Sequence, residues 1–389
     1  MSAAITSLGA VTGFGLGLEP AVAALLEGRS AIRPVTRFST DGLCSSLGSE
    51  APTDAALLAA AAELQQPPAP DRASRLLLAA LADALRGRIL EPNPRRAVVV
   101  GTTKGPLERA VADWECGVAQ TEDLLGGPAR VLAAATGSRG PVFTTGAACA
   151  SSAVALGEAL TLLEDGCCDE VLVGGTEALH SFIYQGFHAL KALAQAPAAP
   201  FDAGRTGLTL GEGAAVLVVE SLLHAQSRGR RPLALVEGFG TAVDGFDQTA
   251  PDPSGAGLLA ACRIALARAG VKAHEIDRYH AHGTATVQND RMEALVHATL
   301  FANAPVPVCA IKGALGHTLG AAAALDIAVC AQTLCQQILP PIVNLRHLDP
   351  SAPVPAVLGI GRPSPGRLAL IANAGFGGIN TAVVLRWPG

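Results

Sequence analysis

Short apolar segments alternate with segments of helical pattern along this chain of 389 residues, and this alternation constrains the fold more than any other feature. Apolar strands that alternate with helices predict an α/β architecture, with largely parallel sheets covered by helices on both faces. In the first half, the expected strands are residues 3–11, 97–102, 140–143, 170–175 and 214–220, and the expected helices are residues 20–27, 72–86 and 150–163.

The same pattern restarts after residues 227–232, which read Ser-Arg-Gly-Arg-Arg-Pro and form the best candidate boundary. We therefore predict two halves of similar size, residues 1–228 and 229–389, which look like an internal duplication by pattern although no sequence repeat is visible. In the second half, the expected strands are residues 233–238, 278–281, 306–311, 369–372 and 381–385, and the expected helices are residues 257–269, 291–301 and 318–336.

Composition excludes several classes of protein. Half of the residues are hydrophobic, and the net charge of -5 argues against a nucleic-acid partner. The nine cysteines are scattered without the spacing of paired metal ligands, which favours a reducing compartment. The absence of Lys or Arg before Arg29 argues against a signal peptide. The uncharged stretch 327–345 contains a Pro340-Pro341 pair, so we expect a buried helix and a turn there, no membrane span, and a cytoplasmic protein.

The expected helix at residues 72–86 has leucines at helical spacing and arginines between them. Its arginines and their neighbours, Arg72, Arg75, Arg86 and Arg88, are expected on a solvated face, with a docking surface for an acidic partner as the alternative.

The first chemically informative stretch is residues 144–152, which read Thr-Thr-Gly-Ala-Ala-Cys-Ala-Ser-Ser between an expected strand and an expected helix. This places Cys149 at a helix N-terminus, where unpaired N–H groups and the helix dipole favour thiolate over thiol. Small neighbours leave room for a substrate. A buried structural cysteine is the alternative, but the position favours a nucleophile.

Two further stretches each place a histidine where a strand ends. Residues 280–286 read His-Ala-His-Gly-Thr-Ala-Thr and put His282 beside a pocket, although a structural histidine is the alternative. Residues 311–320 place His317 at the head of a helix, where the dipole disfavours imidazolium and predicts a neutral ring.

The loop at residues 373–380, with Phe376 in a Gly-Phe-Gly-Gly run, can offer a backbone N–H to an oxyanion. One thiol and two histidines allow nucleophilic acyl transfer followed by a carbanion-forming step. Metal binding is the rival use of these residues, but their spacing contains no local ligand motif and no acidic ligand is adjacent, so we predict no metal.

These motifs together resemble the elongating β-ketoacyl-ACP synthases of the thiolase superfamily. The resemblance rests on Cys149 in TxxACASS, His282 in HAHGTAT, Lys312 and His317 in IKGALGHTLGAA, and the GFGGIN loop. Supporting matches run nearly from end to end, among them GGTEA and PFDAGRTGLTLGEGAAVLVVE. The resemblance implies a duplicated five-layered α-β-α-β-α fold, an acyl carrier protein as partner, a homodimer or a heterodimer with a ketosynthase-like subunit, and no metal or redox cofactor.

The resemblance also implies roles for individual residues. Cys149 would take the acyl chain, with its own N–H and that of Phe376 as the oxyanion hole. His282 and His317 would assist decarboxylation of malonyl-carrier and hold the enolate, and Lys312 would order them through a polar network. Thr284 and Thr286 would hold the phosphopantetheine arm, Lys191 would face the carrier, and Asp326, Gly375 and Gly377 would support the site.

Three departures from the family pattern stand out. Asp326 replaces the usual glutamate, so its carboxylate must lie closer to Lys312 or act through water. Ala374 replaces an aromatic residue that usually crowds the cysteine, and Asp247 replaces a histidine. These changes suggest a specialised synthase, for example in polyene, aryl-polyene or aromatic polyketide assembly, without defining acyl length, starter or pathway.

Two alternatives belong to other classes of protein. A thiolase would carry a second reactive cysteine in a C-terminal CxG loop, where this chain has GFGG. A non-catalytic chain-length factor usually loses the nucleophile, which this chain keeps, although the chain could still need such a partner to be active.

Overall fold

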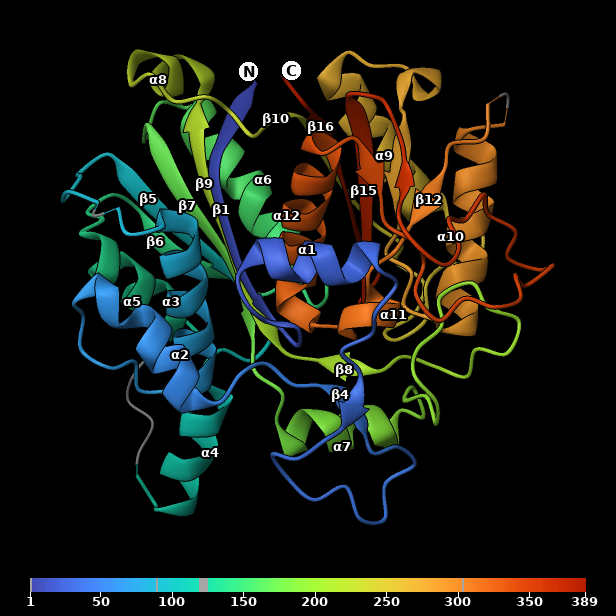
Figure 1. Cartoon of the computed structure of the whole chain (residues 1–389), viewed down its shortest axis with the longest axis horizontal. Helices are drawn as coiled ribbons and strands as arrows, with labels where there is room; N and C mark the ends of the chain where they lie inside the picture. Colours follow the sequence, from blue (N-terminus) through green and yellow to red (C-terminus); the bar gives the residue numbers. More distant parts are fainter. Residues whose placement is uncertain (1, 89, 119–124, 303) are drawn as a thin grey trace.

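The computed structural model describes residues 2–88, 90–118, 125–302 and 304–389, and its centre is one large mixed sheet (Figure 1). The sheet runs in the order β12-β11-β15-β16-β10-β1-β9-β7-β5-β6, with β2 paired to β1. Its strands are β1 (Ala3–Thr12), β2 (Gly15–Leu16), β5 (Arg96–Gly101), β6 (Val142–Thr145), β7 (Glu170–Glu177), β9 (Gly213–Ser221), β10 (Ala234–Val243), β11 (Arg278–His280), β12 (Val308–Cys309), β15 (Leu368–Gly375) and β16 (Ile379–Arg386).

The two halves of the sheet repeat one topology. In the first half, β5 pairs in parallel with β6 and β7, and the antiparallel pairs β7–β9 and β9–β1 follow. In the second half, β11 pairs in parallel with β12 and β15, and the antiparallel pairs β15–β16 and β16–β10 follow. Strands in the same chain order thus occupy the same places in each half, as a duplicated fold requires.

The expectation of largely parallel sheets is wrong, because each half combines two parallel pairs with two antiparallel pairs. Antiparallel strands covered on both faces are as continuously apolar as parallel ones, so the residue pattern does not separate the two cases. The halves also join: three residue pairs connect β1 to β10, from Ala3↔Val236 to Ile5↔Ala234.

The helices complete the predicted five layers. On one outer face α3 covers β1, β7 and β9, and on the other α9 covers β10, β15 and β16. Between the halves lie α6 and α12, which contact each other and the inner strands (Figure 1). The helices are α1 (Leu18–Leu26), α2 (Asp54–Ala61), α3 (Arg72–Leu85), α4 (Leu107–Glu115), α5 (Gly127–Thr136), α6 (Ser151–Glu164), α7 (Ser181–Ala189), α8 (Leu222–Ser227), α9 (Ala256–Ala269), α10 (Val287–Leu300), α11 (Lys312–Leu315) and α12 (Ala322–Cys335).

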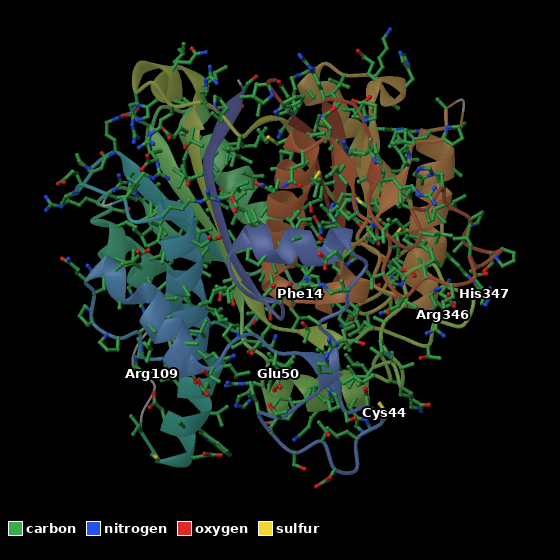
Figure 2. The ribbon with its side chains drawn as sticks, in the orientation of Figure 1. Phe14, Cys44, Glu50, Arg109, Arg346 and His347 are labelled. Atoms are coloured by element: carbon green, nitrogen blue, oxygen red, sulfur yellow. The ribbon has the colours of Figure 1, made fainter. Side chains whose placement is uncertain are left out.

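Small elements cover the ends of the layers. They are the strands β3 (Arg33–Pro34), β4 (Leu47–Ser49), β8 (Leu210–Gly211), β13 (Ile338–Leu339) and β14 (Arg362–Pro363), and the 3-10 helices η1 (Ala62–Leu64), η2 (Ala273–Glu275) and η3 (Leu319–Ala321). Exposed charges such as Arg109 and Arg346 lie at the outside of the molecule (Figure 2). Among the described helices, none has the length and apolar character needed to cross a bilayer.

Helix α12 illustrates how the central layer forms. Every residue from Ala322 to Ala331 is buried, and alanines and other small side chains allow both sheets to approach it closely. One charged residue, Asp326, lies in the middle of this apolar helix. Because a buried carboxylate is costly without partners, its position indicates that polar groups from neighbouring elements converge on it.

Candidate active site

Cys149 lies in a tight turn between β6 and α6. Ala148 adopts a left-handed backbone conformation with φ of 47°, which is unfavourable for a residue with a side chain. Ser151 holds the turn: its Oγ accepts from Ala147 N at 2.9 Å and donates to Ala148 O at 2.6 Å. The turn therefore presents the sulfur at a fixed place in front of the central helices.

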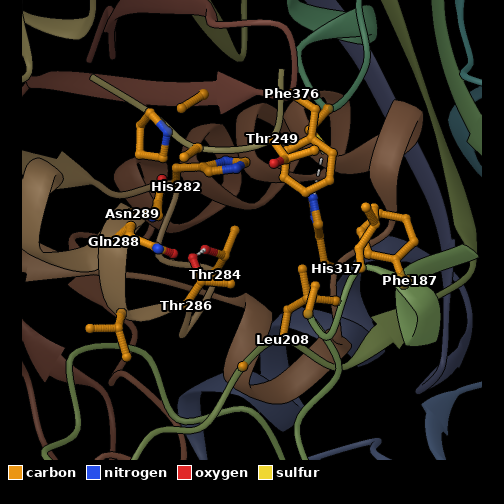
Figure 3. Close-up of a pocket in the computed structure, with 18 of the residues that line it drawn as sticks. Phe187, Leu208, Thr249, His282, Thr284, Thr286, Gln288, Asn289, His317 and Phe376 are labelled. Atoms are coloured by element: carbon orange, nitrogen blue, oxygen red, sulfur yellow. Dashed lines mark hydrogen bonds between the residues drawn. The ribbon is translucent and has the colours of Figure 1, made fainter. Parts of the chain in front are cut away.

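The second half of the chain supplies two imidazoles to the same place. His317 Nε2 lies 3.0 Å from Cys149 Sγ, and the ring centroids of His282 and His317 are 5.3 Å apart with nearly perpendicular planes. Figure 3 shows both rings pointing into one cavity, which Phe376 also lines. The structure thus brings together three side chains that are far apart in the sequence.

Burial dominates the chemistry of the thiol. It raises the pKa of Cys149 to about 11, although the Phe376 N–H and the Lys312 charge act to lower it. The expectation that the helix N-terminus would favour thiolate is therefore not met. At neutral pH the resting group is a thiol, which reacts as it loses its proton.

Both imidazoles are neutral at physiological pH. Burial, followed by the positive charge of Lys312, lowers the pKa of His317 to about 3 and holds the pKa of His282 well below its usual value. The expected cause was a helix dipole, but His317 lies in the turn between α11 and η3, not at the start of an α-helix. Neutrality comes from burial and from Lys312.

The Nδ1 atoms of His282 and His317 are buried without a hydrogen-bond partner among the described residues. A buried N–H without an acceptor is rarer than an unpaired acceptor, so the proton of each ring is best assigned to Nε2. With that assignment, both rings direct an N–H donor into the cavity.

Lys312 does not connect to the histidines as expected. Its Nζ donates to Asp326 Oδ2 at 2.9 Å, and no hydrogen bond joins it to either ring within the described part of the chain. Asn373 Nδ2 donates to the same oxygen at 2.8 Å. The shorter carboxylate of Asp326 therefore reaches Lys312 directly, and Lys312 acts on the histidines through its charge.

The loop after β15 completes the site. The Phe376 N–H points at Cys149 Sγ, and the carbon of a side chain at Gly375 would lie 3.2 Å from Cys149 N and 3.3 Å from Ala147 O. Gly377 has φ of 83°, which favours glycine, and its N–H donates to Gln248 O. Gly375 therefore lets the loop approach the cysteine, whereas Gly377 allows the backbone to turn.

A cavity of about 520 Å³ leads from the surface to Cys149. Thr284 and Thr286 line one wall, with their hydroxyl oxygens 3.0 Å apart, and Lys191 and Arg291 also line it (Figure 3 shows the threonines). The Phe187 and Phe376 rings stack with centroids 5.7 Å apart. The cavity therefore has hydroxyl groups and cations along its length and a thiol at its base.

The remaining departures have local explanations. Asp247 is exposed and accepts from Thr249 N at 2.8 Å and Ala250 N at 3.0 Å, so it shapes a loop whose residues line the cavity. Ala374 also lines the cavity, where its small side chain leaves Phe376 as the aromatic residue of the loop next to the thiol.

Two supporting residues have roles that the sequence does not reveal. Glu293 on α10 accepts from the N–H groups of His282 and Gly283 at 2.7 and 2.8 Å, so it fixes the backbone of the histidine loop. Glu177 accepts from Thr103 N and Gly320 N at 2.8 and 3.0 Å, which ties the His317 segment to the first half. Burial raises the pKa of both carboxyls, that of Glu293 to about 7. The sequence offered one signal for each: Glu293 lies inside an expected helix, and Glu177 follows an expected apolar strand.

Family models match most of the chain. Residues 2–225 match "Beta-ketoacyl synthase, N-terminal domain" and residues 233–346 match "Beta-ketoacyl synthase, C-terminal domain". The chain belongs to the β-ketoacyl synthase family. For this synthase, the family match and the mixed five-layered fold agree with the resemblance seen in its motifs.

Curated relatives of the synthase align over nearly the whole of both chains. It is 32% identical to nodulation protein E of Rhizobium meliloti strain 1021, covering 98% of each chain. It is 33% identical to the tetracenomycin polyketide synthase ketoacyl synthase alpha subunit of Streptomyces glaucescens, covering 99% of this chain and 96% of that one. It is 32% identical to 3-oxoacyl-[acyl-carrier-protein] synthase 2 of Rhizobium meliloti strain 1021, covering 98% of each.

Solved structures extend the likeness to three dimensions. A chain of the ishigamide ketosynthase/chain length factor superposes with a TM-score of 0.91 at 30% identity, covering 100% of this chain and 99% of that one. A chain from a ketosynthase in complex with its chain length factor from Xenorhabdus doucetiae superposes with a TM-score of 0.81 at 28% identity, covering 99% and 98%.

Proposed function

We propose that this chain is a β-ketoacyl-acyl carrier protein synthase that joins an acyl group on Cys149 to malonyl-carrier by decarboxylative Claisen condensation. The observation that carries the proposal is the 3.0 Å separation of Cys149 Sγ and His317 Nε2, beside the ring of His282, at the base of a cavity. A thiol with two neutral imidazoles suits acyl transfer followed by stabilisation of an enolate.

In the first step the Cys149 sulfur attacks the thioester carbonyl of an acyl-carrier. A carbon–sulfur bond forms to Cys149, the bond to the carrier sulfur breaks, and the thiol proton leaves with the carrier thiol. The N–H groups of Cys149 and Phe376 donate hydrogen bonds to the carbonyl oxygen as it gains negative charge, and Gly375 allows the close approach of the Phe376 N–H.

In the second step malonyl-carrier loses carbon dioxide, and the electron pair of the broken carbon–carbon bond forms an enolate. The Nε2–H groups of His282 and His317 hold the enolate oxygen, and neutral rings suit this task because they need not give up a proton. The carbanion then attacks the Cys149 thioester, and the 3-ketoacyl product leaves on the carrier as the carbon–sulfur bond to Cys149 breaks. The released Cys149 thiolate takes up one proton from water and returns to the resting thiol. The reaction uses no metal or redox cofactor.

The cavity suits a substrate on a phosphopantetheine arm. Thr284 and Thr286 would bind the arm, and Lys191 and Arg291, both exposed and both lining the cavity, would attract an acidic carrier. Relatives described as a ketosynthase with a chain length factor support a dimer, either of two copies or with a ketosynthase-like subunit on which activity depends. We place the protein in the cytoplasm.

The pathway is proposed to be a specialised one. Relatives named for nodulation and for tetracenomycin polyketide synthesis align as well as the 3-oxoacyl synthase does. The small Ala374 beside Phe376 leaves the entrance to the thiol less crowded than an aromatic residue would. A polyene, aryl-polyene or polyketide chain would suit such an entrance.

The test is acylation of Cys149 by a panel of acyl chains carried on an acyl carrier protein, read by intact mass. We expect a mass increase equal to the acyl group, loss of this increase and of condensation in Cys149→Ala, and continued decarboxylation of malonyl-carrier by that variant. A wild-type protein that never acylates with any carrier or thioester analogue would contradict the proposal.

A further inference from the structure

Behind the candidate site lies a buried cluster that the proposed reaction does not use directly, formed by His280, Asp326 and Cys309. We propose that His280 is a positioning residue that fixes Asp326, and through it Lys312, beside the reacting groups. The inference rests on the proposed condensation for its role and on the geometry of the cluster for its residues.

The side chain of His280, at the end of strand β11, faces the central helices. Successive side chains of a strand point to opposite faces, so Tyr279 enters the outer apolar core while His280 faces α12. His280 Nε2 lies 3.1 Å from Asp326 Oδ1, and its Nδ1 lies 3.6 Å from Cys309 Sγ on β12. Cys330, one turn after Asp326 on α12, is also within hydrogen-bonding reach of the ring.

The geometry fixes where the proton of His280 lies. A carboxylate that holds the Lys312 ammonium can only accept, so Nε2 of His280 carries hydrogen and donates to Oδ1. Its other nitrogen then meets the Cys309 sulfur, which sets the orientation of the ring. Burial acts to lower the pKa of His280, but the partners around it raise that pKa well above the usual value.

Both oxygens of Asp326 are thereby occupied from different elements. His280 binds Oδ1, while Lys312 and Asn373 bind Oδ2 at 2.9 and 2.8 Å. With one oxygen unbound, the carboxylate could rotate and carry the ammonium with it. Lys312 is the charge that acts on His282, His317 and Cys149, so its position affects all three groups.

This arrangement depends on the lengths of the two side chains, Asp326 and His280. A carboxylate on the short side chain of Asp326 meets a donor on the long side chain of His280, and both side chains are buried. A longer acid at 326 would collide with the ring, and a shorter donor at 280 would not reach. The structure therefore predicts that the two positions compensate for each other.

The test is a double-mutant cycle with His280→Asn and Asp326→Glu. Condensation is measured with a hexanoyl group on Cys149 and malonyl-carrier. Each single change is expected to lower kcat by about tenfold or more with KM for malonyl-carrier nearly unchanged, and the double variant to recover to within about threefold of wild type. The inference would be overturned if the single variants kept the wild-type kcat. It would also be overturned if the fold decrease in kcat of the double variant equalled the product of the fold decreases of the two single variants.

A second readout needs no carrier protein, and so separates this inference from the proposed function. The rate at which iodoacetamide alkylates Cys149, followed by peptide mass spectrometry, should fall severalfold in His280→Asn because a displaced Lys312 no longer lowers the pKa of the thiol. The rate should return in the double variant. An unchanged rate in all three variants would refute the positioning role even if condensation itself were never observed.

His297→Gln is the matched control. His297 is also a buried imidazole, on α10, with Nε2 2.8 Å from Val306 O. Its replacement should lower Tm as much as His280→Asn does while leaving kcat and alkylation unchanged. If His297→Gln lowered kcat equally, general destabilisation would explain both losses and the inference would fail.

Discussion

At the scale of single residues, the thiol of Cys149 determines how the protein responds to pH. Its pKa is raised to about 11, so the thiol form persists through neutral pH and the reactive thiolate increases as pH rises. Alkylation of Cys149 by iodoacetamide should therefore accelerate by about tenfold per pH unit between about pH 7 and about pH 10. Peptide mass spectrometry resolves this site from the other cysteines. A plateau beginning near pH 8 would show instead that the thiol titrates as an ordinary cysteine.

The same residues show what short-range patterns can predict. Cys149 and His282 each follow the end of an apolar strand, and His317 follows the short helix α11. Local sequence was enough to identify all three residues, and the family motifs around them indicated that they act together. His280 was missed because its role depends on Asp326, which lies 46 positions away. The resemblance indicated that the Asp326 carboxylate would lie close to Lys312, and the structure has this contact, but it has no hydrogen bond from Lys312 to the histidine rings among the described residues.

At the scale of elements, the loop between β15 and β16 depends on two glycines for different reasons. A side chain at Gly375 would press on the backbone of Cys149, whereas one at Gly377 would meet open space but a strained φ. Gly375→Ala should slow acylation of Cys149 by about tenfold or more, because it displaces the N–H of Phe376. Gly377→Ala should cost about 1 kcal/mol of stability.

Acylation rates and urea unfolding of the two loop variants distinguish these effects. If Gly375→Ala acylates at the wild-type rate, the loop does not supply the oxyanion hole.

Helix α3 contributes an ion pair to a residue far away in the sequence, as His280 and Asp326 do elsewhere. Arg72 was expected on a solvated face, but it is buried and its Nε donates to Glu212 Oε2 at 2.8 Å, across 140 positions of sequence. Removing one partner of a buried ion pair leaves the other charge unpaired, so Arg72→Met should destabilise the fold by about 3 kcal/mol in urea unfolding.

The matched change is Arg95→Met, which removes an exposed arginine paired with Asp169 and should leave the unfolding midpoint nearly unchanged. Equal midpoints for the two variants would contradict the importance of the buried pair. The local pattern of leucines predicted the helix correctly but could not place Arg72, because the burial of a charge is decided by its distant partner.

At the scale of the whole molecule, β6 ends the main sheet and leads directly to Cys149. An edge strand offers unpaired backbone groups to another chain, and Val142 on this edge is exposed. We expect the purified protein to be a dimer through this edge, and Val142→Lys to shift it towards monomer in light-scattering measurements. Leu223→Lys, at an exposed position on α8, is the control. A dimer unaffected by Val142→Lys would place the interface elsewhere.

The alternation of strands and helices in the sequence predicted two halves of the same architecture. The strand order of the sheet repeats between the two halves, strand for strand. The division at residues 228 and 229 remains our proposal. The hydrogen bonds between β1 and β10 could not be predicted, because an inner edge strand has the same apolar residues whether or not a second sheet pairs with it.

The pairing of β1 with β10, which joins the two halves of the sheet, has a consequence for how the fold arose. Cys149 comes from one half, while His282, Lys312 and His317 come from the other, so neither half could have carried out the proposed chemistry by itself. An ancestral protein of half this length would have needed to pair with a second copy, through the strands equivalent to β1 and β10, before any thioester could react. Fusion into a single polypeptide would then have freed each copy to specialise, one towards the nucleophile and the other towards the imidazoles.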